Sequence, residues 1–377
     1  MSRPEPRLLL GPGPSIVPPA VLQAMARPVM GHLDPDFLAV MDSTRKKLRQ
    51  VFRTENALTF PLSGTGSAGM EAALVNVLEP GDRLLVAVNG YFGTRLADIG
   101  KRLGARVEEV AFEWGEPVTA EKLQEALAQE RAAAVALVHA ETSTGIGSPV
   151  RELAELGRRM GALVIVDCVT SLAGMPVEID AWGIDVAYSG SQKCLSSPPG
   201  LAPFTMSERA VHKLRSRKTP VPSFYLDASL LEKYWGSERS YHHTAPISLV
   251  YALEKSLELA LEEGLEARFR RHRDVHDHLV AELGRLGLEL LGEKSHRLPM
   301  LNAVKLPAGS DEAALRRELL DRYGIEVGGG FGPLKGKIIR VGLMGHSCHQ
   351  ENVDRLITAL RILLNSNGQH QASRISR

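Results

Sequence analysis

One lysine stands in a setting that suits covalent chemistry. Lys193 lies in the segment YSGSQKCLSSPPG (188–200), directly after the mostly apolar run 184–187. Burial of an ammonium group without a counter-charge is costly, so it lowers the pKa of a lysine. The neutral amine can then form a Schiff base with an aldehyde. The alternative interpretation, a surface lysine in a polar loop, stays open on this segment alone.

Two further features are expected to meet Lys193 at one sheet edge. Asp167 ends the apolar run ALVIVD (162–167), and the Gly-rich segment PLSGTGSAGMEAAL (61–74) opens into a predicted helix. A helix N-terminus presents free N–H groups and a positive dipole end, and therefore binds phosphate. Pyridoxal phosphate needs an amine, an acid facing its ring nitrogen, and a phosphate site. Taken alone, Asp167 could equally be a polar strand terminus.

The same glycines also match a dinucleotide-binding pattern. Gly64, Gly66 and Gly69 fit GxGxxG. That pattern should be followed, about 20 residues later, by an acidic residue at the end of the next strand. Here the next predicted strand ends at Asn89 and Gly90, and no GK[ST] follows the glycines, which excludes a P-loop. An NAD-dependent dehydrogenase is therefore the remote alternative.

An arginine and an aromatic residue fit the same cofactor. Arg340 ends a short predicted strand in KIIRVGLMG (337–345), and an arginine fork matches an α-carboxylate through two parallel hydrogen bonds. Phe92 follows a predicted strand end in NGYFG (89–93) and could stack on a flat ring. The alternatives are a surface ion pair for Arg340 and a core aromatic for Phe92.

Apolar strands alternate with amphipathic helices over most of the chain. This alternation predicts an α/β fold with a mostly parallel sheet covered on both faces, and ligands bind beyond the carboxyl ends of such strands. The predicted strands are 83–88, 134–139, 162–167, 185–190, 303–306 and 338–342. The predicted helices are 69–78, 93–103, 120–130, 150–160, 311–323 and 350–364, with a long helical stretch over 246–286 that contains Gly264.

The domain organisation follows from this pattern. We expect an N-terminal segment (1–21), a large domain (22–263), a smaller C-terminal α/β domain (264–364) and a polar tail (365–377). Residues 1–7 are expected to be a tail as well. The chain has 377 residues and is 44% hydrophobic, which is enough for a large core.

The composition narrows the range of partners and compartments. With 45 basic and 44 acidic residues, the net charge of +1 argues against nucleic acid or an anionic membrane as the main partner. The three cysteines form no CxxC or Cys/His pattern with zinc spacing, so we expect neither a disulfide framework nor a metal site. The first 15 residues contain only three consecutive leucines, too few for a signal peptide. We therefore expect a cytoplasmic protein.

Nearly the whole chain resembles the class V, fold-type I aminotransferases that depend on pyridoxal phosphate, in particular the alanine–glyoxylate, serine–glyoxylate and serine–pyruvate group. The resemblance rests on motifs in a specific order and spacing: LLLGPGPS (8–15), GHLDP (31–35), SGTGSAGMEAALVN (63–76), NGYFG (89–93), HAETSTG (139–145), VDCVTSLAG (166–174), SGSQKCLSSPPG (189–200), SFYLD (223–227), YHHTAP (241–246) and IIRVGLMG (338–345).

The resemblance implies a fold and a set of residue roles. The fold would be that of the fold-type I transferases, a large domain with a mostly parallel, seven-stranded type of sheet plus a small α/β domain. Lys193 would hold the cofactor as a Schiff base and then move the proton, and Asp167 would pair with the ring nitrogen. Phe92 and Val169 would cover the two ring faces, and Thr142 would hydrogen-bond near the ring hydroxyl.

The remaining implied roles concern the phosphate, the substrate and the assembly. Arg340 would bind the substrate carboxylate, and the loops around Gly13 and Gly31 would shape the substrate pocket. Tyr241 and Thr244 would complete the phosphate site of the neighbouring subunit, which makes a homodimer with shared active sites necessary for activity. The phosphate would otherwise be held by Thr65, Gly66, Ser67 and Gln192.

The expected reaction is a ping-pong transamination from a small amino acid, alanine or serine, to glyoxylate or pyruvate. Two positions differ from many relatives, with Ser67 where some have histidine and Phe92 where many have tryptophan. Alternatives are a ureidoglycine–glyoxylate aminotransferase, or a lyase such as a cysteine desulfurase. A desulfurase commonly has histidine just before the lysine, where this chain has Gln192. A binding protein that keeps the fold is the non-enzyme alternative, and an aminoethylphosphonate donor fits Arg340 less well.

Overall fold

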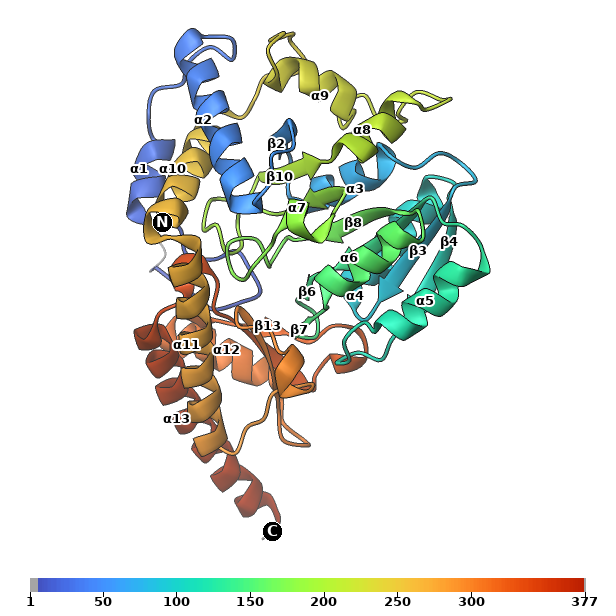
Figure 1. The fold of residues 1–377 in the computed structure, drawn as a ribbon. Coiled ribbons are helices and arrows are strands. Elements are labelled where there is room, and N and C mark those ends of the chain that lie inside the picture. The colour runs from blue at the N-terminus through green and yellow to red at the C-terminus, as the bar shows by residue number, and fades with distance from the viewer. Residues whose placement is uncertain (1–5, 376–377) are drawn as a thin grey trace.

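A computed structural model describes residues 6–375 and has a seven-stranded sheet at the centre of its larger part (Figure 1). The strand order is β2-β10-β9-β8-β5-β3-β4. β10 is antiparallel to both of its neighbours, and the other adjacent pairs are parallel. The strands are β2 (Leu58–Ser63), β3 (Arg83–Val88), β4 (Arg106–Ala111), β5 (Ala134–Val138), β8 (Leu163–Asp167), β9 (Val186–Tyr188) and β10 (Leu201–Met206).

The predicted α/β fold with a mostly parallel sheet is confirmed. Successive residues of β5 and β8 are all buried, which means that both faces of the sheet are covered. A short hairpin of β6 (Ala140–Glu141) and β7 (Ile146–Gly147) extends beyond β5. The helices of this part are α1 (Pro19–Met25), α2 (Pro35–Phe52), α3 (Gly66–Val75), α4 (Tyr91–Arg102), α5 (Ala120–Gln129), α6 (Val150–Arg159), α7 (Ile179–Trp182), α8 (Glu208–Arg215), α9 (Ala228–Trp235) and α10 (Ile247–Glu263).

The C-terminal part is a smaller α/β unit with a hydrophobic cluster of its own. Its antiparallel sheet has the order β11-β14-β13. The N-terminal strand β1 (Leu8–Leu9) pairs with β12 (Ile325–Glu326), and Leu8 and Leu10 belong to this second cluster. Its other elements are α11 (Leu265–Arg285), β11 (Leu301–Lys305), α12 (Glu312–Tyr323), β13 (Gly328–Gly329), β14 (Ile338–Gly342) and α13 (Gln350–Ile375).

The structure adds α1, α2, α7, α8 and α9, which were not predicted from the sequence, and it corrects two of the predicted helical segments. The helical stretch over 246–286 is two helices, because Gly264 has a φ of +82°, a left-handed conformation that ends α10 and that glycine adopts without steric cost. The last helix continues to Ile375 rather than ending at Leu364, so residues 365–375 are not a non-helical tail. A single glycine such as Gly368 lowers helix propensity but does not by itself end a helix. Of the predicted tails, residues 1–5 and 376–377 lie outside the described part.

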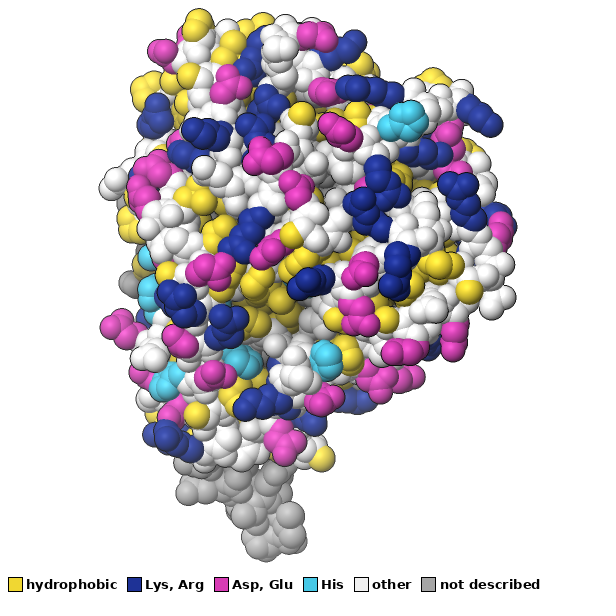
Figure 2. All heavy atoms as spheres, in the orientation of Figure 1, with side chains coloured by type: hydrophobic (Ala, Val, Ile, Leu, Met, Phe, Trp, Pro, Cys, Tyr) yellow, Lys and Arg dark blue, Asp and Glu magenta, His cyan; other side chains and the backbone are white. Residues whose placement is uncertain are grey.

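Two large hydrophobic clusters are consistent with a division into two parts. One runs from Phe37 to Leu257, and another joins Leu8 and Leu10 to residues between Val275 and Leu363. A third, smaller cluster packs Ala140 and Cys194 against residues between Leu298 and Met344 and so joins the two parts. The exact boundaries at residues 21, 263 and 364 stay predictions. In the face shown in Figure 2, basic and acidic side chains are interspersed. No helix among the described residues is both long and apolar enough to cross a membrane.

Candidate functional site

A cavity of about 170 Å³ lies at the carboxyl edge of the large sheet. Asp167 is the last residue of β8, Lys193 follows β9, and α3 begins at Gly66 just after β2. Three chain segments that are far apart in sequence thus meet at one edge. The cavity is lined by Thr65, Gly66, Ser67, Met70, Phe92, Arg95, Val138, Ala140, Thr142, Asp167, Val169, Thr170, Gln192 and Lys193.

Asp167 is a buried carboxyl with fixed orientation. It is 4% exposed, its Oδ1 accepts a hydrogen bond from the N–H of Val169 (2.8 Å), and its Oδ2 accepts one from the hydroxyl of Tyr188 (2.9 Å). Burial raises its pKa to about 6, against which these two hydrogen bonds act. Each carboxylate oxygen has a second lone pair, so the group can still accept a hydrogen bond from a cationic N–H in the cavity.

Lys193 carries an amine that is poised to lose its proton. Burial lowers its pKa to about 8. Its Nζ donates to the carbonyl oxygen of Pro12 in the N-terminal segment. Gly13, the next residue, has a φ of +105°, a conformation that strains other residues, and a Cβ there would lie 2.8 Å from Nζ. A substantial fraction of the amine is therefore neutral near pH 8 and can act as a nucleophile.

The start of α3 can receive an anion. Thr65 is the N-cap residue and makes no side-chain capping hydrogen bond, and the first N–H groups of a helix have no intrahelical acceptor. Gln192 Oε1 is buried without a hydrogen-bond partner in the same cavity. Because a half-turn of the amide exchanges its oxygen and nitrogen, Gln192 can present NH₂ donors there. A phosphate group fits this set of donors.

Flat and small side chains line the cavity between Lys193 and the proposed anion site at the start of α3. Phe92 lies in the first turn of α4, and its N–H donates to Glu141 Oε2 at 3.0 Å. Val169 faces Gly66, where an added Cβ would come within 3.1 Å of its Cγ2. Thr142 lines the same cavity. The residues present are thus compatible with an aromatic ring that carries a phosphate group. Pyridoxal phosphate is such a molecule, and the hydrogen-bond donors of the cavity suit its phosphate.

Arg340 lies beside this cavity without lining it. The side chain is 3% exposed, and burial lowers its pKa to about 10. Its Nε donates to the Gly329 carbonyl (2.6 Å) and its Nη1 to the Thr142 carbonyl (3.1 Å), which connects β14 to the cavity wall. Arginine has five N–H donors, so others are left for a carboxylate.

Tyr241 and Thr244 are not brought to the cavity by this chain. Tyr241 is 62% exposed, and Thr244 is exposed too. The histidines between them hold the loop: His243 hydrogen-bonds to Ser63 Oγ (2.6 Å) and His242 to the Phe224 carbonyl (3.1 Å). These two hydrogen bonds fix the loop that carries Tyr241 and Thr244. The phosphate role of Tyr241 and Thr244 stays a prediction that needs a second subunit.

Several residues of the site were not predicted from the sequence, among them three polar ones with a clear role in its geometry. Arg95 lines the cavity, Tyr188 donates to Asp167, and Glu141 accepts from the backbone of Phe92. Arg95 had a usable signal, because residues three apart on a helix are neighbours and Phe92 already pointed to the site. Glu141 is 0% exposed, and burial raises its pKa.

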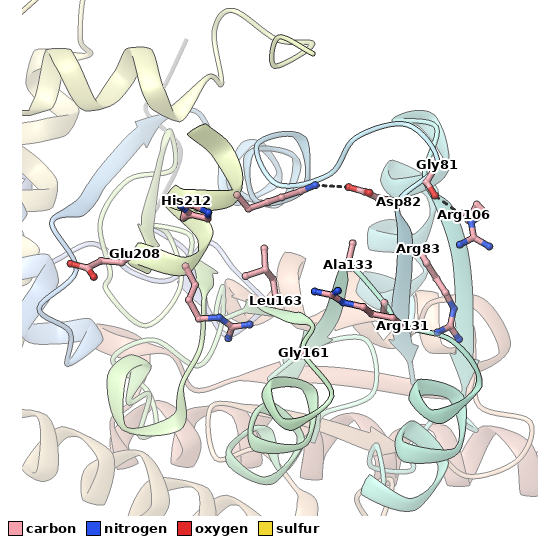
Figure 3. A pocket seen from close by; sticks show the side chains of 13 residues that line it. Gly81, Asp82, Arg83, Arg106, Arg131, Ala133, Gly161, Leu163, Glu208 and His212 are labelled. Carbon is pink, nitrogen blue, oxygen red and sulfur yellow. Dashed lines mark hydrogen bonds and ion pairs between the residues drawn. The ribbon is translucent and has the colours of Figure 1, made fainter. Parts of the chain in front are cut away.

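A larger hollow of about 750 Å³ lies at the opposite, amino edge of the sheet (Figure 3). It is lined with cations, yet most of them already have carboxylate partners. Arg83 pairs with Glu108 at 2.6 Å. Lys213 pairs with Asp82 at 3.1 Å, the contact drawn in Figure 3. Because its charges are largely neutralised and it lies at the amino ends of the parallel strands, it is not the candidate active site.

The thiols do not suit lyase chemistry of the desulfurase type. Cys168, Cys194 and Cys348 are free and buried. Burial raises the pKa of Cys194 to about 11 and that of Cys348 to about 12, which keeps both in the unreactive thiol form at neutral pH. Burial also raises the pKa of Cys168. A desulfurase needs a mobile, ionised cysteine, and these residues do not provide one.

Comparisons with known proteins identify the family of the chain. Residues 7–356 match the family model "Aminotransferase class-V". The chain is 45% identical to an alanine–glyoxylate aminotransferase of Felis catus (94% of this chain, 87% of the relative) and 40% identical to an (S)-ureidoglycine–glyoxylate transaminase of Bacillus subtilis strain 168 (95% and 90%). A crystal structure of an alanine–glyoxylate aminotransferase from Nostoc sp. matches with a TM-score of 0.95 and 53% identity (97% of this chain, 96% of that chain). The chain therefore belongs to the class-V aminotransferases, which are enzymes dependent on pyridoxal phosphate.

Proposed function

We propose that this protein is a transaminase that moves the amino group of alanine or serine to glyoxylate or pyruvate in a ping-pong reaction. The observation that carries the proposal is the meeting of Lys193, Asp167 and the N-terminus of α3 in one cavity. Relatives named alanine–glyoxylate aminotransferase, at 43–45% identity over most of the chain, support the choice of substrates.

The cavity residues would hold pyridoxal phosphate through its charged ends. The phosphate would lie against Thr65, Gly66, Ser67 and Gln192, and the ring would lie between Phe92 and Val169 with Thr142 near its hydroxyl. When bound, the cofactor supplies an electron sink for a carbanion next to the amino group. Asp167 favours the protonated ring nitrogen, because an opposite charge in a buried site stabilises the charged form of both groups.

Lys193 performs the two tasks that need an amine. It holds the cofactor aldehyde until an amino donor arrives, and the lowered pKa keeps part of the amine neutral and nucleophilic. Once released, the same nitrogen takes the α-proton of the donor and later returns it, which is general acid–base catalysis by a group with a pKa near the working pH. The Pro12 carbonyl, which accepts a hydrogen bond from Nζ, holds the amine at the cavity.

Arg340 is the group that would select α-amino acids. Its buried guanidinium is anchored on the Gly329 and Thr142 carbonyls, and this fixes the direction of the remaining N–H donors. A donor carboxylate would pair with them bidentately. A phosphonate donor lacks that α-carboxylate and so fits less well, whereas ureidoglycine carries one and remains the second candidate, favoured by the Bacillus subtilis relative.

A half-reaction screen tests the proposed substrates. Purified holoenzyme is mixed with alanine, serine, ureidoglycine or 2-aminoethylphosphonate without an acceptor, and the loss of the visible cofactor absorbance is followed. We expect alanine or serine to give the fastest loss, and glyoxylate or pyruvate to restore the colour. A faster loss with ureidoglycine would move the assignment to that transaminase, and no loss with any amino acid would contradict a transaminase.

We also propose that the active form is a homodimer with shared sites. The exposed positions of Tyr241 and Thr244 in a single chain support this, as does the fact that neither residue lines the cavity of its own chain. Lys193→Ala and Tyr241→Ala chains should each be weakly active alone. Mixed and refolded together, they should regain up to about half of the wild-type activity per hybrid dimer, because one site then receives both native residues. No recovery in verified hybrids, or a monomer by light scattering, would argue against shared sites.

A further inference from the structure

Arg95 is a cavity residue to which the proposed cofactor site assigns no role. It lies one turn after Phe92 on α4. Its Nη1 donates to the hydroxyl oxygen of Ser67 at 3.2 Å. Its guanidinium carbon lies 5.2 Å from the centre of the Phe92 ring and 5.0 Å from that of Tyr91. Arg95 therefore joins the stacking wall of the cavity to the start of α3.

This guanidinium has no carboxylate partner within 4.0 Å among the residues that the structure describes, unlike the other cations of its helix. Lys101 pairs with Glu109 at 2.6 Å, and Arg102 pairs with Asp98 at 2.8 Å. Arg95 thus brings an unneutralised positive charge next to the proposed anion site at the start of α3. Lys193 is the other basic residue that lines the same cavity.

The hydrogen bond to Ser67 has a chemical consequence. A serine hydroxyl has a single proton and two acceptor sites. Because its oxygen accepts from Arg95, the hydroxyl directs its own proton elsewhere, and Ser67 is the second residue of α3, next to the unpaired backbone N–H groups. The cation, the hydroxyl and the helix dipole then all favour an anion at the same place.

We propose that Arg95 is a positioning residue for the cofactor phosphate. It orients Ser67 as a hydrogen-bond donor, supplies positive charge to a dianionic group, and holds Phe92 through its contact with the ring face. The inference rests on the proposed function, since it takes pyridoxal phosphate as the ligand. It adds a residue from α4 to the part of the phosphate site that this chain builds from α3 and the loop after β9.

The test compares two ligands that differ only in the phosphate. Apo-protein is titrated with pyridoxal phosphate and with pyridoxal, and binding is followed by absorbance. Arg95→Gln should weaken the binding of pyridoxal phosphate roughly 10- to 30-fold, which is the effect expected for a lost charge-assisted hydrogen bond. Pyridoxal affinity should change less than about 2-fold, because pyridoxal lacks the phosphate that Arg95 is proposed to meet. Arg102→Gln is the matched control on the same helix and should change neither affinity.

Two additional variants make the result decisive. In a Ser67→Ala background, Arg95→Gln should reduce the affinity for pyridoxal phosphate by a smaller factor than in the wild type, because part of the effect of Arg95 depends on the Ser67 hydroxyl. Arg95→Lys should keep much of the affinity. The proposal would be overturned if Arg95→Gln reduced the affinities for pyridoxal phosphate and pyridoxal equally, or if it reduced neither. Labelling of Lys193 by borohydride in the Arg95→Gln protein shows separately whether the proposed function stands.

Discussion

Lys193→Ala should lose transamination almost completely while the fold stays intact. The amine that holds the cofactor and the base that moves the proton are the same group, so a single substitution removes both. General acid–base catalysis alone is worth about 10²- to 10⁴-fold, and loss of covalent capture adds to it, so we expect a decrease of ~10⁴-fold or more. The measurement is turnover of alanine and glyoxylate without added amine.

Lys213→Ala is the matched control for this substitution. Lys213 lies at the amino edge of the sheet, where it pairs with Asp82, and should be dispensable for catalysis. A circular dichroism spectrum like that of the wild type would show that Lys193→Ala is folded. Partial recovery with a small added amine is expected, because free amine can replace the missing base. Near-normal turnover without it would contradict the role given to Lys193.

Asp167→Asn should separate catalysis from stability. Asparagine keeps the shape of the side chain but not its charge, so the ring nitrogen loses a buried ionic partner. Such a loss costs about 3–5 kcal/mol, which corresponds to a decrease in kcat/KM of roughly 200- to 5,000-fold. Tyr188→Phe is the milder comparison, since it removes one hydrogen bond of about 1 kcal/mol from Asp167 and leaves the charge in place.

The Asp167→Asn substitution should also stabilise the apo-protein. Burial raises the pKa of Asp167 from 3.8 to about 6. A carboxyl whose pKa is raised on folding disfavours the folded state once pH exceeds the unfolded value, and the penalty is complete above about pH 6. Apo Asp167→Asn should therefore melt at a higher temperature than apo wild type at pH 7.5, and the difference should shrink towards pH 4. A lower melting temperature at pH 7.5 would contradict the assigned environment of Asp167.

The parts of the fold that the sequence predicts well are those with one dominant signal. β3 and β14 match the predicted ranges, because short, mostly apolar runs of five or six residues that end at or near a glycine favour buried strands. β4 (RVEEVA) was missed because it is a largely exposed edge strand with two adjacent glutamates. β10 (LAPFTM) was missed because Pro203 argues against a strand, although it lies in the sheet opposite Pro61 of β2.

The residues of the candidate site also differ in whether the sequence carries a local signal for them. Asp167 and Lys193 could be found from the sequence because each follows an apolar strand, and such strand ends gather at one edge of a parallel sheet. The anchoring of Arg340 on Thr142, residues 198 positions apart, depends on how the small domain docks and has no local signal. Tyr188 was read as a strand residue, and only its hydroxyl contact with Asp167 reveals more.

Reduction of the holoenzyme with borohydride, followed by peptide mapping, tests the central claim most directly. Borohydride converts the linkage between the cofactor and the protein into a stable C–N bond, which marks the nitrogen that held the aldehyde. The account predicts a single modified peptide containing SGSQKCLSS (189–197), with the added mass on Lys193, and no such peptide from Lys193→Ala. A stoichiometric tag on another lysine, or no tag on protein shown to contain the cofactor, would contradict it.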